Sequence, residues 1–555
     1  MEGMKSSKTT LATLGLGLLL LAGCASLSGT FGLGASPNLR VGIVSDVHLR
    51  NEPGFDAYFL KALRWFDAKK VDAVVIPGDL TDQTMNMQLE HFKRCWDEVF
   101  AGNRRSDGAP VEPVFVTGNH DDEGALYIIH DCDGLAPAKI TGLANGRRPP
   151  DQVIAGISNA IAKARNAVSL NVPAGKARPT LAALDAFEGR FRAAGTNVAA
   201  IAALAGEAGR IQTNACALFF SEAFVTNLPA VWPRLFGEEY ASFFHKRVKG
   251  YDFIGVNWDF IGWKGDIQGL DEYMASQDLP ADRPFFYIQH PHPKGTCHGD
   301  KVWGQDNGSS TNVLSKYPNA IALSGHSHNS LADERAIWQG AFTSIGCASL
   351  YYLDMVPGGE IKPPPKGTGR HGLLLDVFDD RVVVERRDFF HDEELAPKWV
   401  FPATYAAGDE RPCSFEWRAA HCGVPEFPRG AAATLTVSNP KAIAAGKLCP
   451  IDVSFPLAKD GGRGGRLAEF EVRVEYEGTN GVAVSKSKRV LPPNSFWARH
   501  RWGETVTTRF NVRDLPAAGT PFRVAIRPAN AFGGKGRPIY TEYVRPGAAA
   551  AKAGK

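Results

Sequence analysis

Short apolar runs alternate with amphipathic stretches along the N-terminal part of the chain. Between the first two runs, Phe55, Phe59, Leu63 and Phe66 recur at the spacing of one helical face. Polar, glycine-containing sequence follows most of the runs at once, which is typical of α/β folds, where functional groups gather at the carboxyl ends of strands. The predicted strands are 39–44, 71–76, 111–116, 252–257, 284–289, 319–324, 372–378 and 381–385.

Three further regions depart from this alternation. Residues 133–210 are rich in alanine and carry apolar residues at helical spacing, which predicts a helical insertion, either a cap near the functional site or a remote hairpin. Glycine and proline at 357–369 predict a surface loop. After about residue 430, short strands separated by turn residues predict an all-β sandwich. Within it, the segment 522–538 (FRVAIRPANAFGGKGRP) resembles the end of a fibronectin type III domain.

The first 24 residues have the features of an export signal. Lys5 and Lys8 precede the apolar stretch 11–21, which has the length of a signal-peptide core and is short for a membrane span. The stretch runs into Leu-Ala-Gly-Cys, which resembles the bacterial lipobox, so Cys24 is the expected lipidation site. The resemblance implies a protein tethered to the bacterial cell envelope, on the periplasmic or cell-surface side. An ordinary signal peptide and an uncleaved anchor are the alternatives.

Composition narrows the class of protein without assigning a function. Hydrophobic residues make up 44% and charged residues 22%, which excludes disorder, collagen and coiled coil as the dominant state. The 62 lysines and arginines nearly balance the 59 acidic residues, so charge gives no reason to expect nucleic-acid binding. Nine cysteines are too few for a disulfide scaffold in a chain of 555 residues.

Five short polar blocks stand at or near the ends of predicted strands, and they concentrate histidine and aspartate. A dinuclear hydrolytic site needs oxygen and imidazole ligands, with one carboxylate that can bridge two divalent ions. Alternation at a strand end would point residues i and i+2 to the same side, and the first and last blocks each hold two candidate ligands at that spacing. Five blocks in this setting indicate a metal site, whereas one alone would not. The blocks are 46–48 (DVH), 78–82 (GDLTD), 118–121 (GNHD), 290–292 (HPH) and 325–328 (GHSH).

The order of these blocks resembles the signature of the calcineurin-like metallophosphoesterases over about residues 40–390. The resemblance implies an α/β (α+β) fold, a four-layer α-β-β-α sandwich, with two divalent metal ions (Mn, Fe, Zn or Mg) at one edge. For the first ion it implies the ligands Asp46, His48, Asp79 and His328. For the second ion it implies Asp79, Asn119, His290 and His326, so that Asp79 bridges.

The same resemblance assigns roles to residues around the metals. It implies that His120 contacts the phosphate and acts as general acid, and that Asp82 orients His120. His292 is a candidate for substrate contact. Gln83 and Asp121 depart from the protein serine/threonine phosphatases, and Asp82 replaces the tyrosine of the purple acid phosphatases. A phosphodiesterase-like branch remains, which also includes phosphomonoesterases.

The sequence therefore predicts a metal-dependent phosphoesterase at the cell envelope, in which a hydroxide activated by two metals attacks a phosphate ester, with a phosphodiester favoured. A phosphomonoesterase or nucleotidase is one alternative. A non-catalytic surface protein that binds a partner, such as a glycan, through its β-sandwich is another. The expected regions are a signal and lipobox at 1–24, a tether at 25–38, a catalytic domain at 39–410 with its insertion at about 133–210, and a fibronectin type III-like sandwich at 430–547.

Overall fold

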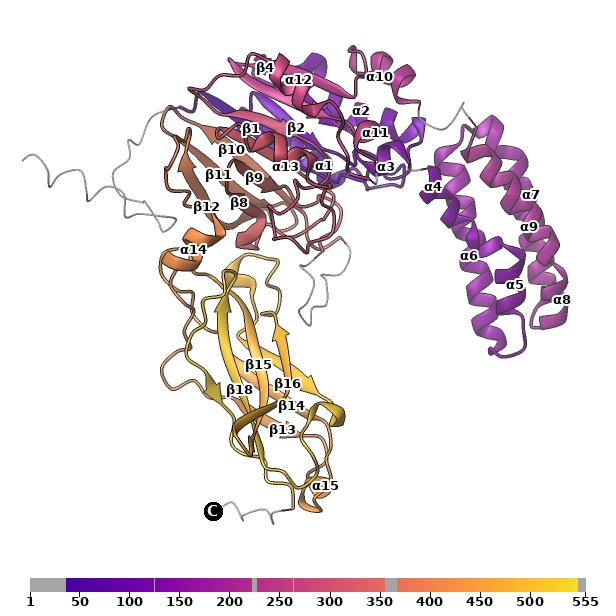
Figure 1. The fold of residues 1–555 in the computed structure, drawn as a ribbon. Coiled ribbons are helices and arrows are strands. Elements are labelled where there is room, and N and C mark those ends of the chain that lie inside the picture. The colour runs from indigo at the N-terminus through magenta and orange to yellow at the C-terminus, as the bar shows by residue number, and fades with distance from the viewer. Residues whose placement is uncertain (1–35, 124, 222–226, 263, 355–366, 548–555) are drawn as a thin grey trace, which may run out of the picture.

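A computed structural model describes residues 36–123, 125–221, 227–262, 264–354 and 367–547. These residues form an α/β unit, a helical bundle and an all-β region (Figure 1). The segment with Cys24 and nearly all of the loop expected at 357–369 lie outside the described residues. Of the helices that the structure describes, none combines the length and the apolar character needed to cross a bilayer.

Two six-stranded mixed sheets form the centre of the α/β unit. The first has the order β12-β11-β10-β1-β2-β3, with β1, β2 and β3 parallel and the other neighbours antiparallel. Its strands are β1 (Leu39–Ile43), β2 (Ala73–Pro77), β3 (Glu112–Val116), β10 (His371–Val377), β11 (Arg381–Asp388) and β12 (Glu393–Pro402).

The second sheet has the order β4-β5-β6-β7-β9-β8, in which β5, β6, β7 and β9 run parallel. The two outer pairs are antiparallel. Its strands are β4 (Phe243–Val248), β5 (Tyr251–Val256), β6 (Phe285–Ile288), β7 (Ala320–Ser324), β8 (Ile337–Gln339) and β9 (Thr343–Gly346).

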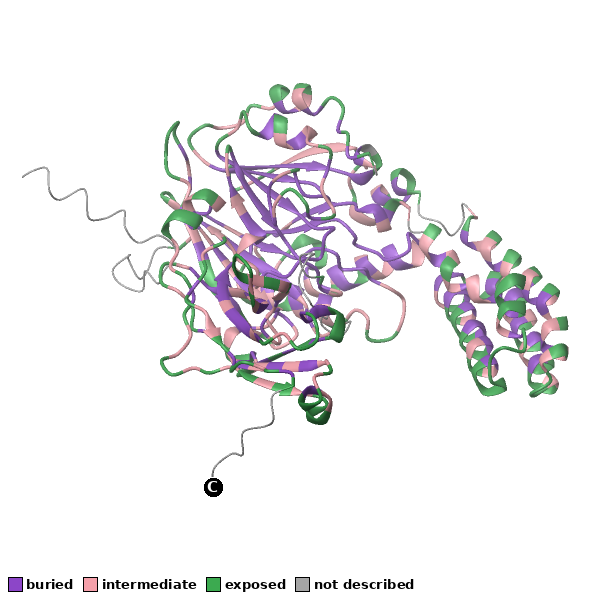
Figure 2. Ribbon diagram, turned by 60° about the horizontal axis from the view of Figure 1, so that its bottom comes forward, coloured by how far each residue is buried: buried purple, intermediate pink, exposed green. Residues whose placement is uncertain are grey.

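Three apolar cores separate four layers, as expected for an α-β-β-α sandwich. One core lies between the sheets and joins Val41 of β1 to Phe286 of β6. The second packs helices on the first sheet, and here Phe59, Leu63 and Phe66 are buried as predicted. The third lies between the second sheet and its helices. Strands β2, β6 and β7 are buried along their whole length because both faces are covered (Figure 2).

The helices of the α/β unit are short and cover the outer faces of the sheets. They are α1 (Ala57–Ala68), α2 (Asn86–Val99), α3 (Asn119–Asp122), α10 (Leu228–Phe236), α11 (Trp258–Ile261), α12 (Leu270–Ser276) and α13 (Ser309–Leu314).

A helical bundle with its own apolar core stands to one side of the α/β unit (Figure 1). Val153, Ile157 and Ile161 line the buried face of its longest helix at the spacing seen in the sequence. The helices are α4 (Ala125–Ile128), α5 (Pro137–Leu143), α6 (Pro150–Asn171), α7 (Ala174–Ala194), α8 (Val198–Ala203) and α9 (Ala205–Phe219).

The C-terminal region is all-β, as predicted. A three-stranded sheet, β13-β14-β17, shares one core with a four-stranded sheet, β16-β15-β18-β19, and all neighbouring strands are antiparallel. Strand β16 was not predicted, because its small and charged residues at a largely exposed sheet edge lack an apolar pattern. The elements are α14 (Phe415–His421), β13 (Thr434–Val437), α15 (Pro440–Ala444), β14 (Ile451–Pro456), β15 (Leu467–Gly478), β16 (Gly481–Val490), β17 (Thr505–Phe510), β18 (Phe522–Asn530) and β19 (Ile539–Tyr540).

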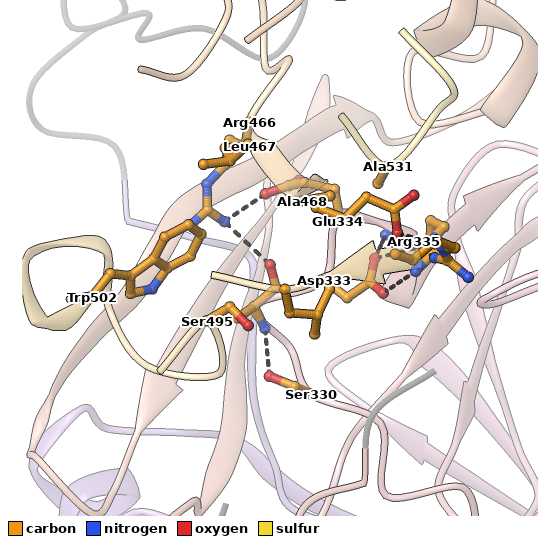
Figure 3. A pocket seen from close by; sticks show the side chains of 14 residues that line it. Ser330, Asp333, Glu334, Arg335, Arg466, Leu467, Ala468, Ser495, Trp502 and Ala531 are labelled. Atoms are coloured by element: carbon orange, nitrogen blue, oxygen red, sulfur yellow. Dashed lines mark hydrogen bonds and ion pairs between the residues drawn. The ribbon is translucent and has the colours of Figure 1, made fainter. Parts of the chain in front are cut away.

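The all-β region is joined to the α/β unit through a buried carboxylate, Glu334. Arg466, directly before β15, donates to Glu334 Oε1 at 2.8 Å, beside a small pocket (Figure 3). Arg386 of β11 donates to the same oxygen at 2.9 Å, and Trp399 donates to Oε2 at 3.0 Å. Phe496, from the loop after β16, lies in the core between the two sheets of the α/β unit. The two regions therefore share both an ion-paired cluster and part of a core.

Candidate metal centre

The five polar blocks follow β1, β2, β3, β6 and β7, so the two sheets bring their carboxyl ends to one site. The residues do not reach it by strand alternation, which was the sequence argument. Asp46, His48, Asp79, His326 and His328 all lie beyond their strands with positive φ, between 47° and 66°. This left-handed backbone is uncommon for residues other than glycine and marks sites held by their surroundings.

The glycines of these blocks leave room for the carboxylates. A methyl group on Gly118 would lie 2.2 Å from Asp79 Oδ1. On Gly325, it would lie 2.3 Å from Asp46 Oδ2. Any side chain at these positions would therefore displace a candidate ligand, which explains the Gly-Asn-His and Gly-His-Ser-His patterns physically.

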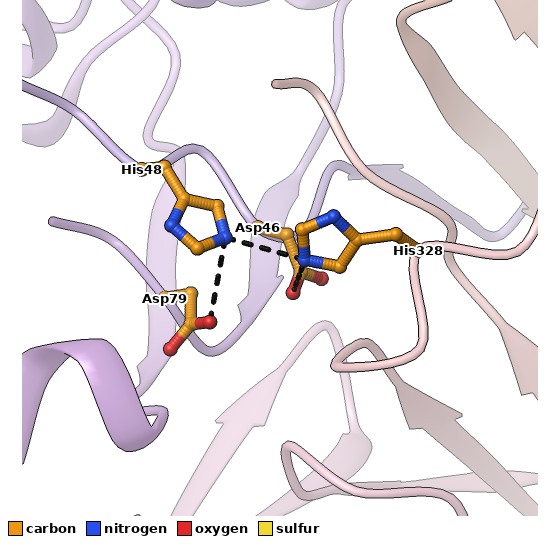
Figure 4. A group of neighbouring side chains, drawn as sticks. All are labelled: Asp46, His48, Asp79 and His328. Carbon is orange, nitrogen blue, oxygen red and sulfur yellow. Dashed lines mark hydrogen bonds and ion pairs between the residues drawn. The ribbon is translucent and has the colours of Figure 1, made fainter. Parts of the chain in front are cut away.

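Asp46, His48, Asp79 and His328 converge as the first ligand set requires (Figure 4). His328 Nε2 lies 2.9 Å from Asp46 Oδ1 and 3.2 Å from His48 Nε2. His48 Nε2 lies 3.5 Å from Asp79 Oδ2. One ligand atom from each of the four residues lies within 4.8 Å of the others.

The other ring nitrogen of these histidines is already engaged. His48 Nδ1 donates to Asp82 Oδ1 at 2.9 Å, and His328 Nδ1 donates to the carbonyl of Tyr352 at 3.2 Å. His290 Nδ1 likewise donates to the carbonyl of Pro77 at 2.8 Å. This leaves each Nε2 directed into the centre, which is how proteins orient imidazoles that bind metals.

Asn119, His290 and His326 lie near one another beside Asp79. His290 Nε2 lies 3.1 Å from Asn119 Oδ1 and 3.3 Å from Asp79 Oδ2. The rings of His290 and His326 are 4.7 Å apart. Asp79 is therefore shared by both proposed ligand sets, as a bridging carboxylate must be.

The chemistry of this donor set fits divalent metal ions. Buried carboxylates and imidazoles are costly unless they are paired or coordinate a metal. Burial alone would raise the pKa of Asp79, but His290, His120 and His48 hold it well below its ordinary value, so the carboxylate stays ionised. Carboxylate, amide and imidazole ligands together suit Mn, Fe, Zn or Mg.

His120 lies beside the centre with its side chain 20% exposed. Its Nδ1 donates to the backbone carbonyl of Asp82 at 2.7 Å, and its backbone N–H donates to Asp79 Oδ1 at 2.9 Å. Burial lowers the pKa of His120, but the charges of Asp79 and Asp82 outweigh it and raise the pKa above its ordinary value. Because Nδ1 donates to a carbonyl, Nε2 is the ring nitrogen left for proton transfer to a substrate.

The carboxylate of Asp82 serves a different histidine from the one expected. Its Oδ1 is 2.9 Å from His48 Nδ1 but 3.7 Å from His120 Nδ1, and Arg50 Nη2 binds its Oδ2 at 2.7 Å. The main chain of Asp82 orients His120, while its side chain orients His48. Asp82 thus contacts His120 as expected, through its carbonyl and at ion-pair distance, and it also hydrogen-bonds His48, which the resemblance did not indicate.

Asp121 fixes the relative position of two of the blocks. Its carboxylate accepts hydrogen bonds from the backbone N–H groups of Leu80, Thr81 and Gly118 at 2.8–3.0 Å. Burial, followed by the charge of Asp79, raises the pKa of Asp121 to about 6. Asp121 therefore has a structural role, because its carboxylate joins the loop that holds Asp79 to the loop that holds Asn119.

His292, the candidate for substrate contact, points away from the centre. It is 1% exposed, and its two ring nitrogens bond to the hydroxyls of Ser324 and Ser327, each at 2.6 Å. Burial and the neighbouring His298 lower its pKa to about 3. Because the ring is buried and both of its nitrogens are hydrogen-bonded, His292 supports the block 325–328 and is not available to contact a substrate.

Arg50 and Tyr127, both at the centre, were not found from the sequence. Arg50 stands two positions after His48, so the spacing of the first block offered a signal. Tyr127 stacks on His120 with 4.0 Å between ring centroids, but a lone tyrosine after the third block belongs to no pattern. Cys24, the expected lipidation site, lies outside the described residues.

Comparison with known proteins gives one match of sequence and several of structure. Residues 39–156 match the family described as calcineurin-like phosphoesterase. Among curated proteins, none matches the chain.

Two solved structures illustrate the structural likeness. GAP50, the anchor in the inner membrane complex of Plasmodium, is 10% identical with a TM-score of 0.32, covering 66% of this chain and 89% of that one. A dimetal phosphatase from Danio rerio is 12% identical with a TM-score of 0.30, covering 67% and 100%.

The matched segment contains the first three blocks, with Asp46, His48, Asp79, Asn119 and His120. The remaining candidate ligands, His290, His326 and His328, reach the same centre from the second sheet. Residues 39–156 therefore belong to a calcineurin-like phosphoesterase domain, whose family uses divalent metal ions to hydrolyse phosphoester bonds.

Proposed function

We propose that this protein is a dinuclear phosphoesterase that cleaves a phosphodiester. The observation that carries the proposal is Asp79, whose Oδ2 lies 3.5 Å from His48 Nε2 and 3.3 Å from His290 Nε2, so that one oxygen faces a ligand of each proposed ion. The seven candidate ligands around it are Asp46, His48, Asp79, Asn119, His290, His326 and His328.

The residues divide the work between binding and proton transfer. When bound, two divalent ions would lower the pKa of water and stabilise charge on the phosphoryl oxygens. Asp79 would hold both ions, and Asp82 would keep His48 in the correct tautomer through Nδ1. His120, held at Nδ1 by the carbonyl of Asp82, would give the proton on Nε2 to the leaving alkoxide.

The charge balance around His120 supports a diester over a monoester. A monoester is a dianion near neutral pH, so its extra charge favours an added cation beyond the metals. Arg50, which reaches the centre in the part of the chain that the structure describes, is already paired with Asp82 at 2.7 Å and lies 3.6 Å from Glu52. A diester carries one negative charge and does not need this help.

The test compares two chromogenic esters. Purified protein lacking residues 1–24 is loaded with Mn²⁺ and assayed on bis-p-nitrophenyl phosphate and on p-nitrophenyl phosphate. We expect kcat/KM to be higher for the diester. Faster cleavage of the monoester would support a phosphomonoesterase or nucleotidase instead. Binding of Mn²⁺ without turnover of either ester would contradict the proposal.

We also propose that the protein acts at the cell envelope, anchored through an acylated Cys24. The support is the sequence alone, where Leu-Ala-Gly-Cys follows an apolar stretch. Intact-mass measurement of membrane-fraction protein is the check. The acyl mass should be present in the wild type and absent in Cys24→Ala, and a wild type without it would refute the anchor.

A further inference from the structure

The helical bundle reaches the metal centre through Tyr127 of α4. The ring of Tyr127 lies parallel to His120, with 4.0 Å between centroids and 9° between planes. Its hydroxyl accepts a hydrogen bond from Asn119 Nδ2 at 2.9 Å. One side chain thus contacts both the proposed proton donor and a proposed metal ligand.

The stack completes the orientation of His120. Its Nδ1 is fixed by the carbonyl of Asp82, a bond about which the ring could still tilt. The His48 ring meets His120 edge-on, with 4.5 Å between centroids and 77° between planes, and Tyr127 covers a face of the ring. A stacked aromatic partner is attractive beyond the area that it buries, so the contact favours one tilt of the ring.

The hydroxyl of Tyr127 anchors the Nδ2 end of the Asn119 amide. Because Nδ2 donates to Tyr127, Oδ1 is directed to the side of His290, whose Nε2 is 3.1 Å away. Divalent ions bind an amide through its oxygen, so the opposite rotamer would present the wrong atom. Partners that orient a ligand in this way are worth roughly 10–100-fold in metal affinity or activity.

The same short helix is built into the bundle. Ile128, the next residue, is fully buried in the bundle core. Just beyond it, Asp131 accepts from Gln83 Nε2 at 3.0 Å, and Gln83 directly follows Asp82. The position of Tyr127 therefore depends on the packing of the bundle as well as on the centre.

We propose that Tyr127 is a positioning residue, through which the helical bundle sets the orientation of His120 and Asn119. The inference rests on the proposed function and deepens it, because it gives the bundle a role in the same site. The stack orients the proton donor, and the hydroxyl orients a ligand of the second metal, so the two contacts have separable effects.

The experiment uses Tyr127→Phe, which keeps the stack, and Tyr127→Leu, which removes both contacts. Leu126→Ala, an exposed neighbour on α4, is the matched control. The readouts on the full chain are kcat and KM for bis-p-nitrophenyl phosphate, Mn²⁺ affinity by calorimetry, and the melting temperature. Tyr127→Leu should lower kcat about 10–100-fold with a smaller change in KM. Tyr127→Phe should restore most of kcat at saturating Mn²⁺ yet bind the second Mn²⁺ about 10-fold more weakly.

Wild-type kcat and Mn²⁺ affinity in Tyr127→Leu would overturn the inference. Equal loss of kcat in the Phe and Leu variants at saturating Mn²⁺ would overturn the role of the stack. If the wild type binds Mn²⁺ but cleaves no ester, the proposed function fails separately. Even then, the role of the Tyr127 hydroxyl can be judged from Mn²⁺ binding alone. Weaker binding of Mn²⁺ by Tyr127→Phe than by the wild type would support the orientation of Asn119. Equal affinities in the two proteins would overturn it.

Discussion

His120 and the metal ligands beside it differ in exposure, and this separates their roles. Asp79 is 2% exposed and His290 is fully buried, whereas the His120 side chain is 20% exposed. A group that exchanges protons with a substrate must be reachable, while groups that hold ions are better enclosed.

His120→Ala should therefore remove the proton donor and leave the metal ligands in place. We expect kcat to fall by about 10²–10⁴-fold, the usual worth of a general acid. Metal content, measured by elemental analysis, should equal that of the wild type. His130→Ala, at an exposed position on the bundle side, is the control and should change neither quantity. Unchanged kcat in His120→Ala would rule out this role.

Among the strands and helices, those with a strong apolar pattern of their own could be predicted from the sequence. The fully buried strands β2, β6 and β7 are continuous apolar runs and were predicted within about two residues. The short β8 and β9, the half-buried β4 and the edge strands β12 and β16 were missed because pairing partners, rather than their own residues, make them strands.

The residues of the site could be predicted from the sequence, but the contacts between their side chains could not. The blocks could be found because five polar clusters near strand ends are rare by chance. That Asp82 would turn its carboxylate to His48, or that His292 would be buried under Ser324 and Ser327, depends on tertiary packing. Tyr127 belongs to the same class, since its contacts require the bundle to be in place.

The attachment of the bundle rests on a buried amide network that can be tested. Asn171, at the end of α6, accepts from Gln88 Nε2 of α2 at 3.0 Å and is 4% exposed. Asn171→Ala should cost about 1–3 kcal/mol locally, because the buried amide of Gln88 loses a partner. Hydrogen exchange at the last turn of α6 should become faster by at least about fivefold. Asn166→Ala, exposed on the same helix, is the control, and equal protection in both variants would contradict the network.

For the whole molecule, Glu334 is one of the contacts that hold the all-β region to the α/β unit. Its side chain is 11% exposed and is shared by Arg386 and Arg466. Burial alone would raise the pKa of Glu334, but the charges of Arg386, Arg466 and Arg418 lower it from 4.5 to about 2. The all-β region therefore contributes to the packing of the α/β unit, because its Arg466 completes a buried cluster there.

This shift predicts an acid dependence of stability. Since the folded pKa of Glu334 is depressed, its contribution is fully present above pH 4.5 and is lost as the pH falls toward 2. The contribution is roughly 3 kcal/mol at neutral pH. Melting temperatures between pH 6 and pH 2.5 should fall more steeply for the wild type than for Glu334→Gln, which should melt lower at pH 7. Exposed Glu416→Gln should follow the wild type. Parallel curves for the wild type and Glu334→Gln would contradict this account.

The central claim, that Asp79 holds two ions used for phosphoester cleavage, is tested most directly by Asp79→Asn. Wild-type and variant protein are loaded with Mn²⁺, freed of excess metal, and measured for bound metal per chain and for turnover of bis-p-nitrophenyl phosphate. We predict two ions and turnover in the wild type. In Asp79→Asn we predict fewer than two ions and a loss of turnover greater than about 100-fold, beyond the usual effect of an outer-shell partner. An Asp79→Asn protein that keeps two ions and full activity would contradict the claim.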